Sequence, residues 1–432
     1  MKMHLFRLLG AALFLAAPIF PAAAQTCPPL YAKDFDRDGI VVTNGTYREV
    51  GGLAVLPSGK IILTVTESAV KEGNPDQHAA IYQSTDGGDT WSYVRDIDPP
   101  SMVESSWWMP SYDPAADRLW FIGMFNKNNV REIPYNDRDA TSKKVVAIGW
   151  PRLQYSDDEG QTLNVLPPGY ANYQPTAADN RNPFGGLHKL AWFPPGTTRV
   201  RNGWLYAPYA KRGKVLWGKT WDDSEAFILK FPLNATDALG KIEFLPGGNY
   251  GMTALNQLPD GSNAPGGDSN EEPAFDFFDD GRIYGVFRND SGYLGEFRIS
   301  ADEQTVTTGW AQREDGATGR PVPHPRATPW VKNTGNGKWL LGVHNNTSGD
   351  LGKGRNTYWI YTGEESQTVP GKIIWNKGPR AIVAQMNIER RMQGPAPIEV
   401  GDDYLFVMND KHPDHDDDVR VFKFPKDDIL CD

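Results

Sequence analysis

The sequence contains 432 residues, of which 39% are hydrophobic and 23% charged, and it carries a formal net charge of −10. An acidic chain with scattered lysines and arginines lacks the concentrated positive charge that nucleic-acid binding requires. Beyond the first 24 residues, no stretch of the sequence approaches the roughly 20 apolar residues of a transmembrane helix. We therefore expect neither nucleic acid nor a membrane as a partner.

Residues 1–24 predict a signal peptide. Lys2 and Arg7 form a basic start, Leu8–Phe20 an apolar segment, and Ala22–Ala24 a small-residue cleavage site. Removal of this segment takes the net charge from −10 to −12, because two basic residues leave with it. The mature protein is expected to be periplasmic or secreted.

Residues 25–432 contain no linker, charge block or low-complexity segment, so we expect a single domain. We also expect the protein to be a monomer. The two cysteines of the sequence, Cys27 and Cys431, lie at opposite ends of this segment. In an exported protein a pair of cysteines predicts a disulfide. Such a bond requires a fold that brings both ends of the mature chain together.

Asp34, Asp36 and Asp38 follow the first cysteine in a D-x-D-x-D-G pattern. This spacing directs alternate carboxylates toward one point, as in calcium-binding loops. Gly45 stands where an EF-hand has its closing glutamate, so an EF-hand is not expected. We expect no required cofactor, and these aspartates are a candidate structural calcium site.

Short strand-like segments separated by turns recur through the rest of the chain, while helical periodicity is nearly absent. The segments form units that each lead from a first strand to a strongly apolar second strand. In chain order the units are Gly51–Leu56, Lys60–Val65, Ala79–Gln83 and Trp91–Arg95; Trp108–Tyr112, Leu119–Met124, Arg152–Tyr155 and Thr162–Val165; Leu187–Phe193, Trp204–Tyr209, Ala226–Phe231 and Ile242–Leu245; Glu272–Phe278, Arg282–Asn289, the strand after Ser291-Gly292 and Thr305–Trp310; Thr328–Val331, Trp339–His344, Thr357–Tyr361 and Lys372–Trp375; and Ala396–Val400, Tyr404–Met408 and Val419–Phe424.

The sixth unit has three strands, and Gly39–Thr43 near the other end of the chain can supply its fourth. A propeller closes in this way, because one blade built from both termini removes the open seam of the ring. The predicted fold class is therefore all-β. It is a six-bladed β-propeller of four-stranded antiparallel blades, closed by an N-terminal strand in the last blade.

Two turns share a sharper pattern. Ser84–Trp91 and Ser156–Leu163 both read S-x-D-x-G-x-T-[W/L], and both fall between the third and fourth strands of their units. The aspartate of each turn can accept hydrogen bonds from backbone N–H groups, and glycine permits positive φ. These are Asp boxes, and with them the chain resembles the sialidase superfamily of six-bladed propellers.

Glu272 lies at the start of one strand of the fourth unit, and Arg288 lies near the end of the next. Antiparallel strands joined by a short turn return to the same edge, so these two charges should meet there. A carboxylate and an arginine at one end of a sheet suit a site for an anionic sugar. A surface ion pair is the alternative.

The resemblance implies that three arginines hold a substrate carboxylate, and Arg48, Arg288 and Arg355 stand at the matching places. Converging guanidinium groups would form a bidentate carboxylate clamp. The resemblance also implies a catalytic aspartate on the loop between the second and third strands of the first unit. We assign this role to Asp76, with Glu72 as the second choice and His78 as a neighbour.

The family nucleophile is a tyrosine activated by a glutamate, and Glu272 is the candidate glutamate. The tyrosine should lie near Arg390–Pro395, where the sequence has none. Either Tyr47, Tyr206 or Tyr209 replaces it, or the chemistry differs.

A polysaccharide lyase is therefore a second interpretation. A propeller lyase would bind a uronate through arginine or histidine and remove a proton with histidine or tyrosine, and His188, Tyr206, Tyr209 and Arg212 are the candidates. A third interpretation is a non-catalytic propeller that stacks glycans on tryptophans such as Trp107, Trp108, Trp204 or Trp217. Our preferred hypothesis is an exported sialidase-like exo-glycosidase that acts on an acidic oligo- or polysaccharide.

Overall fold

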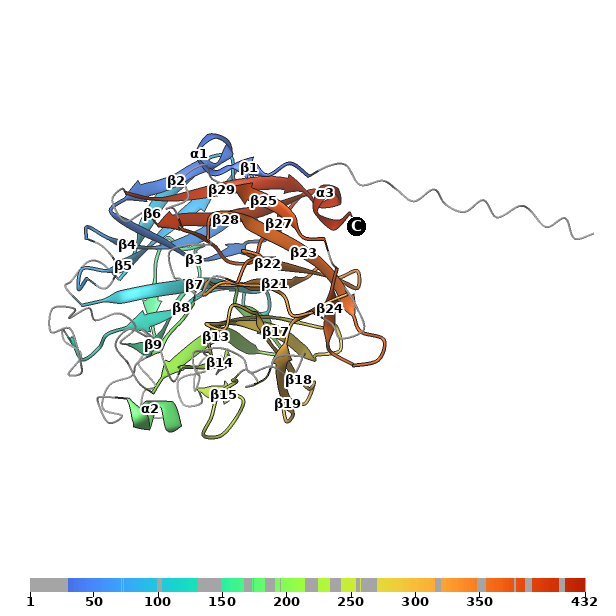
Figure 1. Ribbon diagram of the computed structural model, residues 1–432. Coiled ribbons are helices and arrows are strands. Elements are labelled where there is room, and N and C mark those ends of the chain that lie inside the picture. Colours follow the sequence, from blue (N-terminus) through green and yellow to red (C-terminus); the bar gives the residue numbers. More distant parts are fainter. Residues whose placement is uncertain are drawn as a thin grey trace, which may run out of the picture.

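The structure is a computed structural model that describes residues 30–70, 72, 74–98, 103–130, 149–166, 173, 175–182, 191–194, 196–213, 224–233, 242–253, 257, 270–314, 320–347, 355–376, 378–384, 391–411 and 416–431. The described residues are mostly β-strands, and they include three short helices (Figure 1). Cys27 and the predicted signal peptide lie outside the described residues, so the disulfide and the leader stay predictions. No helix among the described residues is long and apolar enough to cross a membrane.

The fold is a β-propeller with blades of four antiparallel strands, and each of the first five predicted units corresponds to one blade. Their strands are β3 (Tyr47–Val55), β4 (Ile61–Ser68), β5 (His78–Ser84) and β6 (Ser92–Asp98) in sheet one; β7 (Ser105–Asp113), β8 (Arg118–Phe125), β9 (Trp150–Ser156) and β10 (Asn164–Val165) in sheet two; β11 (Ala191–Trp192) and β12 (Arg199–Arg201) beside β13 (Trp204–Arg212), β14 (Ser224–Pro232) and β15 (Glu243–Leu245) in sheet three; β16 (Asn270–Phe277), β17 (Ile283–Asn289), β18 (Gly295–Ile299) and β19 (Val306–Trp310) in sheet four; and β21 (Trp330–Asn333), β22 (Lys338–Val343), β23 (Tyr358–Glu365) and β24 (Ile373–Trp375) in sheet five.

A further sheet, sheet six, contains the last strands of the chain. It is built from β26 (Arg391–Gln393), β27 (Ile398–Val400), β28 (Asp403–Lys411) and β29 (Asp417–Pro425), and β2 (Ile40–Gly45) pairs antiparallel with β29. Figure 1 shows β2, near the start of the chain, beside β29, near its end. The predicted strand Ala396–Val400 is shorter than expected, because β27 begins only after Pro397, which has no N–H to donate to β28.

The N-terminal segment also reaches sheet five. β1 (Lys33–Asp34) pairs in parallel with β25 (Arg380–Ala384), which itself pairs with β23, and β20 (Gln312–Arg313) pairs with β24. Helix α1 (Phe35–Asp38) lies between β1 and β2, whereas α2 (Ala177–Arg181) and α3 (Lys426–Leu430) lie elsewhere in the chain. The segment that begins at Lys33 is thus paired with two neighbouring sheets.

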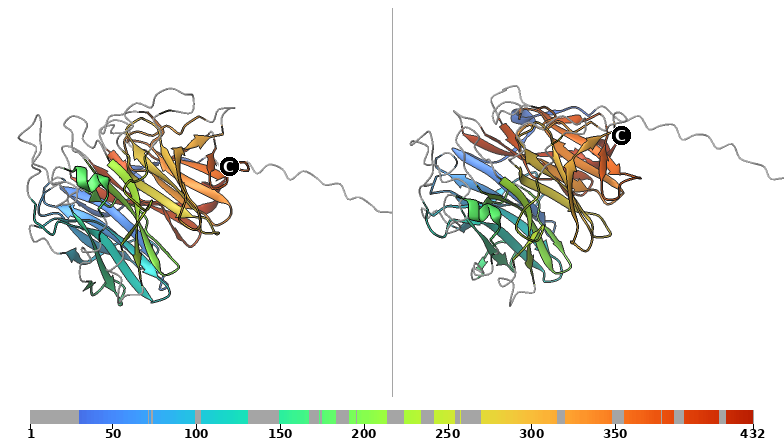
Figure 2. Two further views of the ribbon diagram at one scale, coloured as in Figure 1. Left: turned by 90° about the horizontal axis from the view of Figure 1, so that it is seen from below. Right: turned by 60° about the horizontal axis from the view of Figure 1, so that its bottom comes forward.

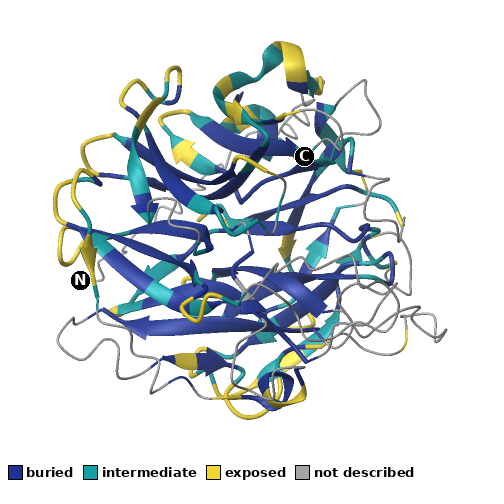
Figure 3. Ribbon diagram, turned by 90° about the vertical axis from the view of Figure 1, so that its left-hand side faces the viewer, coloured by how far each residue is buried: buried dark blue, intermediate teal, exposed yellow. Residues whose placement is uncertain are grey.

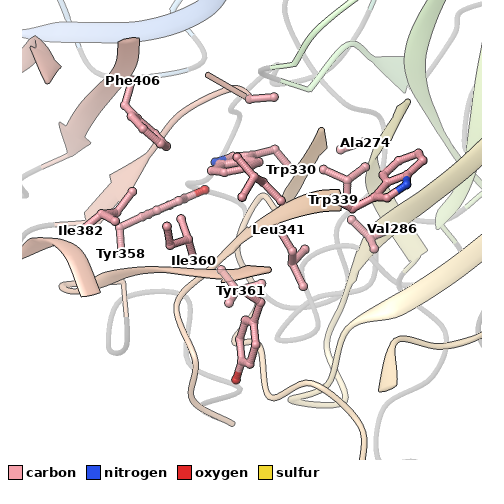
Figure 4. Close-up of a cluster of buried hydrophobic side chains, with 14 of the residues drawn as sticks. Ala274, Val286, Trp330, Trp339, Leu341, Tyr358, Ile360, Tyr361, Ile382 and Phe406 are labelled. Carbon is pink, nitrogen blue, oxygen red and sulfur yellow. The ribbon is translucent and has the colours of Figure 1, made fainter. Parts of the chain in front are cut away.

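Apolar side chains fill the spaces between sheets, while the exposed residues gather in the turns (Figure 3). The largest cluster lies among sheets four, five and six and includes the fully buried Trp330, Trp339 and Tyr358 (Figure 4). Burial of each such side chain stabilises the folded protein by about 1.5–3 kcal/mol. Gly342 of β22 is needed there, because a Cβ atom would lie 2.1 Å from the Trp330 ring. Two further views show the sheets side by side around the molecule (Figure 2).

The two S-x-D-x-G-x-T turns are closed by their aspartates. Asp86 accepts hydrogen bonds from the N–H groups of Asp89 (3.1 Å) and Thr90 (3.0 Å), and from the hydroxyl of Thr90 (2.6 Å). Asp158 accepts hydrogen bonds from the N–H group of Thr162 (2.8 Å) and from its hydroxyl (2.7 Å). These bonds satisfy backbone donors that the hairpin leaves unpaired.

The carboxylates of the predicted calcium loop interact with protein groups. Asp34 caps α1 by accepting from the N–H groups of Asp36 and Arg37, and Asp38 accepts from the N–H of Asp34 and pairs with Arg37 at 2.7 Å. The part of the chain that the structure describes contains no group of three acidic, histidine or cysteine side chains arranged to hold a metal. These contacts favour a helix cap over a calcium loop.

Candidate functional site

Polar side chains gather at one end of the propeller. This end is formed by the first residues of the strands β3, β7, β16 and β26, and by the last residues of β13, β17 and β28. Because the strands of a blade are antiparallel, a first strand begins where the second one ends. The side chains that meet there are those of Tyr47, Glu49, Trp107, Arg212, Glu271, Glu272, Arg288, Arg326, Thr328, Arg355, Gln393 and Lys411.

A β-bulge at the start of β16 turns two consecutive carboxylates toward this end. The register between β16 and β17 shifts between Glu271 and Ala274, and Glu272 has a φ of 51°. A non-glycine residue rarely adopts this conformation, which costs about 1–3 kcal/mol and tends to occur at functional sites. The same irregularity recurs in β7, where Trp107 has a φ of 52°.

The two carboxylates share a set of buried arginines, which we call the arginine cluster (Arg212, Arg288, Arg326 and Arg355). Glu272 accepts from the Arg288 guanidinium at 2.7 Å and from the Thr328 hydroxyl at 2.6 Å. Glu271 lies 3.2 Å from Arg288, 3.3 Å from Arg326 and 4.0 Å from Arg212. The side chains of Arg212, Arg288 and Arg326, which pair with these glutamates, are only 3–8% exposed.

The electrostatics of the cluster follow from this burial. Burial alone would raise the pKa of Glu272, but the charge and hydrogen bond of Arg288 outweigh it and hold this pKa at about 2. Burial and the neighbouring positive charge of Arg288 lower the pKa of Arg355 to about 9. Glu272 is therefore ionised at neutral pH and orients Arg288, and an additional anion would stabilise charged Arg355.

Arg355 joins the cluster from the residues before β23. Its guanidinium donates to the carbonyl of Arg326 and, at 3.3 Å, to the side-chain oxygen of Gln393. Its Nε has no hydrogen-bond partner among the described residues, although the side chain is buried. Two of the three arginines expected from the sequence, Arg288 and Arg355, thus lie together beside Glu272.

Arg48 does not share these contacts. Its guanidinium lies against the Tyr47 carbonyl (2.7 Å), the Thr43 hydroxyl (3.4 Å) and Glu67 (3.4 Å), between sheets one and six. Neighbouring residues on a strand point to opposite faces, so Glu49 takes the direction that was expected for Arg48. The arginine cluster is formed without a member from sheet one.

Glu49 accepts hydrogen bonds from groups on three different sheets. Tyr47 donates to it from the same strand, Trp107 at 3.0 Å from β7, and Gln393 from β26, while Lys411 lies 3.1 Å away. Burial and the adjacent Glu49 raise the pKa of Tyr47 well above its ordinary value. Tyr47 and Glu49 form a tyrosine–glutamate pair, although on sheet one and not before the last blade.

The loop between β4 and β5 contributes Glu72 more directly than Asp76. Glu72 lies 3.4 Å from Lys411, close to the tyrosine–glutamate pair. Asp76 accepts from the Ser68 hydroxyl at 2.6 Å and from the N–H of Ala69 at 2.9 Å. Burial would raise the pKa of Asp76, but these bonds lower it overall, which does not suit a proton donor. The ring of His78 faces the Asp76 carbonyl at 3.0 Å.

The residues proposed for a lyase are spread over different surroundings. The Tyr206 hydroxyl donates to Glu303 at 2.7 Å, whereas Tyr209 packs on Phe193 in the core between sheets two and three. Arg212 belongs to the arginine cluster, and His188 lies outside the described residues. The tyrosines and Arg212 therefore do not converge on one site.

The described tryptophans that were considered for sugar stacking are buried or in contact with other side chains. The Trp107 indole donates to Glu49, Trp108 is fully buried, and Lys230 lies over the Trp204 ring at 4.4 Å. Trp217 lies outside the described residues. These contacts favour packing over an exposed glycan platform.

Sequence reasoning missed Glu271, Arg326, Glu49, Gln393 and Lys411. Glu271, Glu49, Gln393 and Lys411 lie near strand ends on the same side as Glu272, and Arg326 lies four residues before β21. This position in the repeat is the signal that could have indicated them. Two histidines also support this region: His324 lies two residues before Arg326 and stacks on His344 at 6.1 Å. Burial lowers the pKa of His324 to about 3 and that of His344 as well, so both are neutral at neutral pH.

No protein-family model matches the sequence, and no curated protein matches it either. Solved structures do match the fold. An intramolecular trans-sialidase from Ruminococcus gnavus is 13% identical with a TM-score of 0.55, covering 91% of this chain and 98% of that one. The leech intramolecular trans-sialidase is 13% identical with a TM-score of 0.54 and covers 92% and 70%, respectively. An α-L-arabinofuranosidase from Fusarium graminearum is 11% identical with a TM-score of 0.50 and covers 89% and 97%. The chain thus shares the β-propeller fold of these sialidase and arabinofuranosidase structures.

Proposed function

We propose that the protein is an exported, sialidase-like exo-glycosidase that acts on an acidic glycan. The observation that carries the proposal is the arginine cluster, which is buried at the end of the propeller where the first strands begin. Four arginines surround two glutamates there, so this cluster carries more positive than negative charge. Preorganised guanidinium groups bind a carboxylate without the reorganisation that water requires.

Arg288 and Arg355 would hold the carboxylate of the sugar, and Arg326 would complete the clamp. Tyr47 is the proposed nucleophile, because its hydroxyl already donates to Glu49. Attack of the phenol oxygen on the anomeric carbon would form the glycosyl–tyrosine bond and break the glycosidic bond, while Glu49 accepts the phenol proton. The leaving oxygen would take a proton from a loop carboxylate, for which Glu72 is better placed than Asp76. Water then hydrolyses the intermediate by the reverse proton transfers.

The wider architecture is part of the same proposal. We infer a ring of six blades in which β2 completes the last one, since β2 pairs with β29. A disulfide between Cys27 and Cys431 and a monomeric, periplasmic or secreted protein are consistent with this closure. The sequence-based expectations of no nucleic acid, no membrane partner and no required cofactor remain part of it.

Product analysis with acidic glycans tests the reaction class. Incubation with sialylated oligosaccharides and with uronate polysaccharides should release a free acidic monosaccharide. An unsaturated uronate with new ultraviolet absorbance would identify a lyase instead, and binding without products would identify a non-catalytic glycan-binding propeller. Either result would overturn the glycosidase proposal.

The Arg288→Ala variant tests the site. Loss of a charge-assisted clamp in a buried site should lower kcat/KM by at least about 100-fold. Arg282→Ala is the matched control, because Arg282 precedes the same strand β17 but pairs with Asp280 and Glu365 at the opposite end of the blade. Equal activity of the two variants would show that the arginine cluster does not bind the substrate.

A further inference from the structure

Gln393 connects the arginine cluster to the tyrosine–glutamate pair. Its side-chain oxygen accepts from Arg355 at 3.3 Å, and its side-chain nitrogen donates to Glu49. The side chain is 3% exposed, so water does not compete for either bond. The backbone fixes the same arrangement, since the N–H of Met392 donates to the carbonyl of Arg355 at 3.0 Å.

The two contacts give the amide a fixed direction. A guanidinium has donors only, and an ionised carboxylate has acceptors only. Lys411 lies 3.1 Å from Glu49, and its positive charge stabilises the ionised carboxylate. The oxygen of Gln393 must therefore face Arg355 and its nitrogen must face Glu49. A carboxylate at position 393 would repel Glu49, a cation would repel Arg355, and an apolar side chain would bind neither.

We propose that Gln393 is a positioning residue that couples anion binding at Arg355 to the geometry of Glu49 and Tyr47. An anion that draws the Arg355 guanidinium toward itself displaces the amide oxygen, and the amide nitrogen transmits this displacement to the Glu49 carboxylate. Occupation of the arginine cluster thus sets the position of the carboxylate that accepts the Tyr47 hydroxyl. This inference rests on the proposed function for its catalytic meaning, while the coupling itself can be measured without turnover.

The indole N–H of Trp107 provides that measurement. It donates to Glu49 at 3.0 Å and lies on a different sheet from Arg355, so it reports on the carboxylate and not on the anion directly. In the mature protein with ¹⁵N-labelled tryptophan, sodium acetate is the probe, and a Trp107→Phe variant assigns the resonance. Acetate should shift the Trp107 resonance in the wild type and leave it unmoved in Gln393→Leu, in which calorimetry should still detect acetate binding. A wild-type resonance that does not respond to acetate, or an equal shift in Gln393→Leu, would overturn the coupling.

Kinetics separate the coupling from a merely structural role. Gln393→Glu retains an acceptor for Arg355 but places a second carboxylate against Glu49. The two carboxylates repel each other unless they share a proton, and that proton is bound more readily at lower pH. We expect its KM for the cleaved glycan to stay within about threefold of wild type, its kcat at pH 7 to fall at least about tenfold, and its activity optimum to move to lower pH. Gln367→Glu, at an exposed position, is the matched control and should change none of these.

The outcomes distinguish the two proposals. If no acidic glycan is cleaved but the acetate-dependent shift of Trp107 requires Gln393, the proposed reaction fails and the coupling stands. If glycans are cleaved but Gln393→Glu and Gln393→Leu lose the same kcat at every pH, Gln393 only supports the fold locally and the coupling fails.

Discussion

At the scale of single residues, the low pKa of Glu272 predicts how the free energy of unfolding depends on pH. Its pKa of about 2 lies below the ordinary value of 4.5, so the ionised side chain stabilises the folded protein above pH 4.5 and loses this effect as the pH falls toward 2. Glu272→Gln removes this stabilising charge and leaves buried Arg288 with one ion-pair partner fewer. The substitution should lower the free energy of unfolding by about 3 kcal/mol at pH 7.

Urea unfolding of both proteins at pH 7 and pH 3 checks this value. The difference between wild type and Glu272→Gln should narrow at the lower pH, whereas the exposed control Glu364→Gln should track the wild type at both. A difference that is the same at both pH values would mean that Glu272 is not held ionised by the arginine cluster.

The residue scale also shows what one sequence can and cannot reveal about a site. Glu272 and Arg288 could be paired in advance, because a short hairpin brings them together whatever the rest of the chain does. The direction of Arg48 could not be predicted, since a shift of one residue along a strand exchanges the two faces. Glu49 and Gln393 meet although 344 positions separate them, and only the packing of sheet one against sheet six brings them into contact.

At the scale of elements, the two Asp-box turns predict a separation between stability and binding. They connect the third and fourth strands of sheets one and two, at the end of the propeller opposite the arginine cluster. Asp158→Ala should lower the free energy of unfolding by about 1 kcal/mol, because the Thr162 donors lose their acceptor. Asp86→Ala should act in the same direction in sheet one. Calorimetry with acetate should give unchanged affinity in both variants, and a weaker affinity would show that these turns also shape the binding end.

Elements were more predictable than the contacts between them. The strands of sheets one, two and four follow from alternating side chains and turn residues, which are local signals. β25 and β1 were not expected, because a two-residue parallel pair such as Lys33 with Val383 is formed by tertiary packing and leaves no local pattern. The division between β26 and β27 has a local cause, because Pro395 and Pro397 lie between them and have no N–H to donate to β28.

At the scale of the whole molecule, the N-terminal segment joins sheets that the rest of the chain leaves adjacent but separate. β1 extends sheet five through β25, and β2 extends sheet six through β29. Phe35, on the helix between them, is fully buried and packs on Phe422 at 5.6 Å, with Arg420 over its ring at 5.4 Å. We therefore expect this segment to act as a clasp between sheets five and six, and the stability of the propeller to depend on it more than its length suggests.

Phe35→Ala tests the clasp. Truncation of a fully buried phenylalanine should lower the free energy of unfolding by about 3–5 kcal/mol. If β2 completes the ring, hydrogen exchange should become faster along β29 and also along β3, the first strand of the neighbouring sheet, because both lose support when the clasp loosens. Val41→Ala is the control, since Val41 lies on β2 but is 46% exposed, and it should leave exchange almost unchanged. Faster exchange confined to the residues around Phe35 would show that the N-terminal segment does not stabilise β29 or β3. That result would contradict the inferred six-bladed closure.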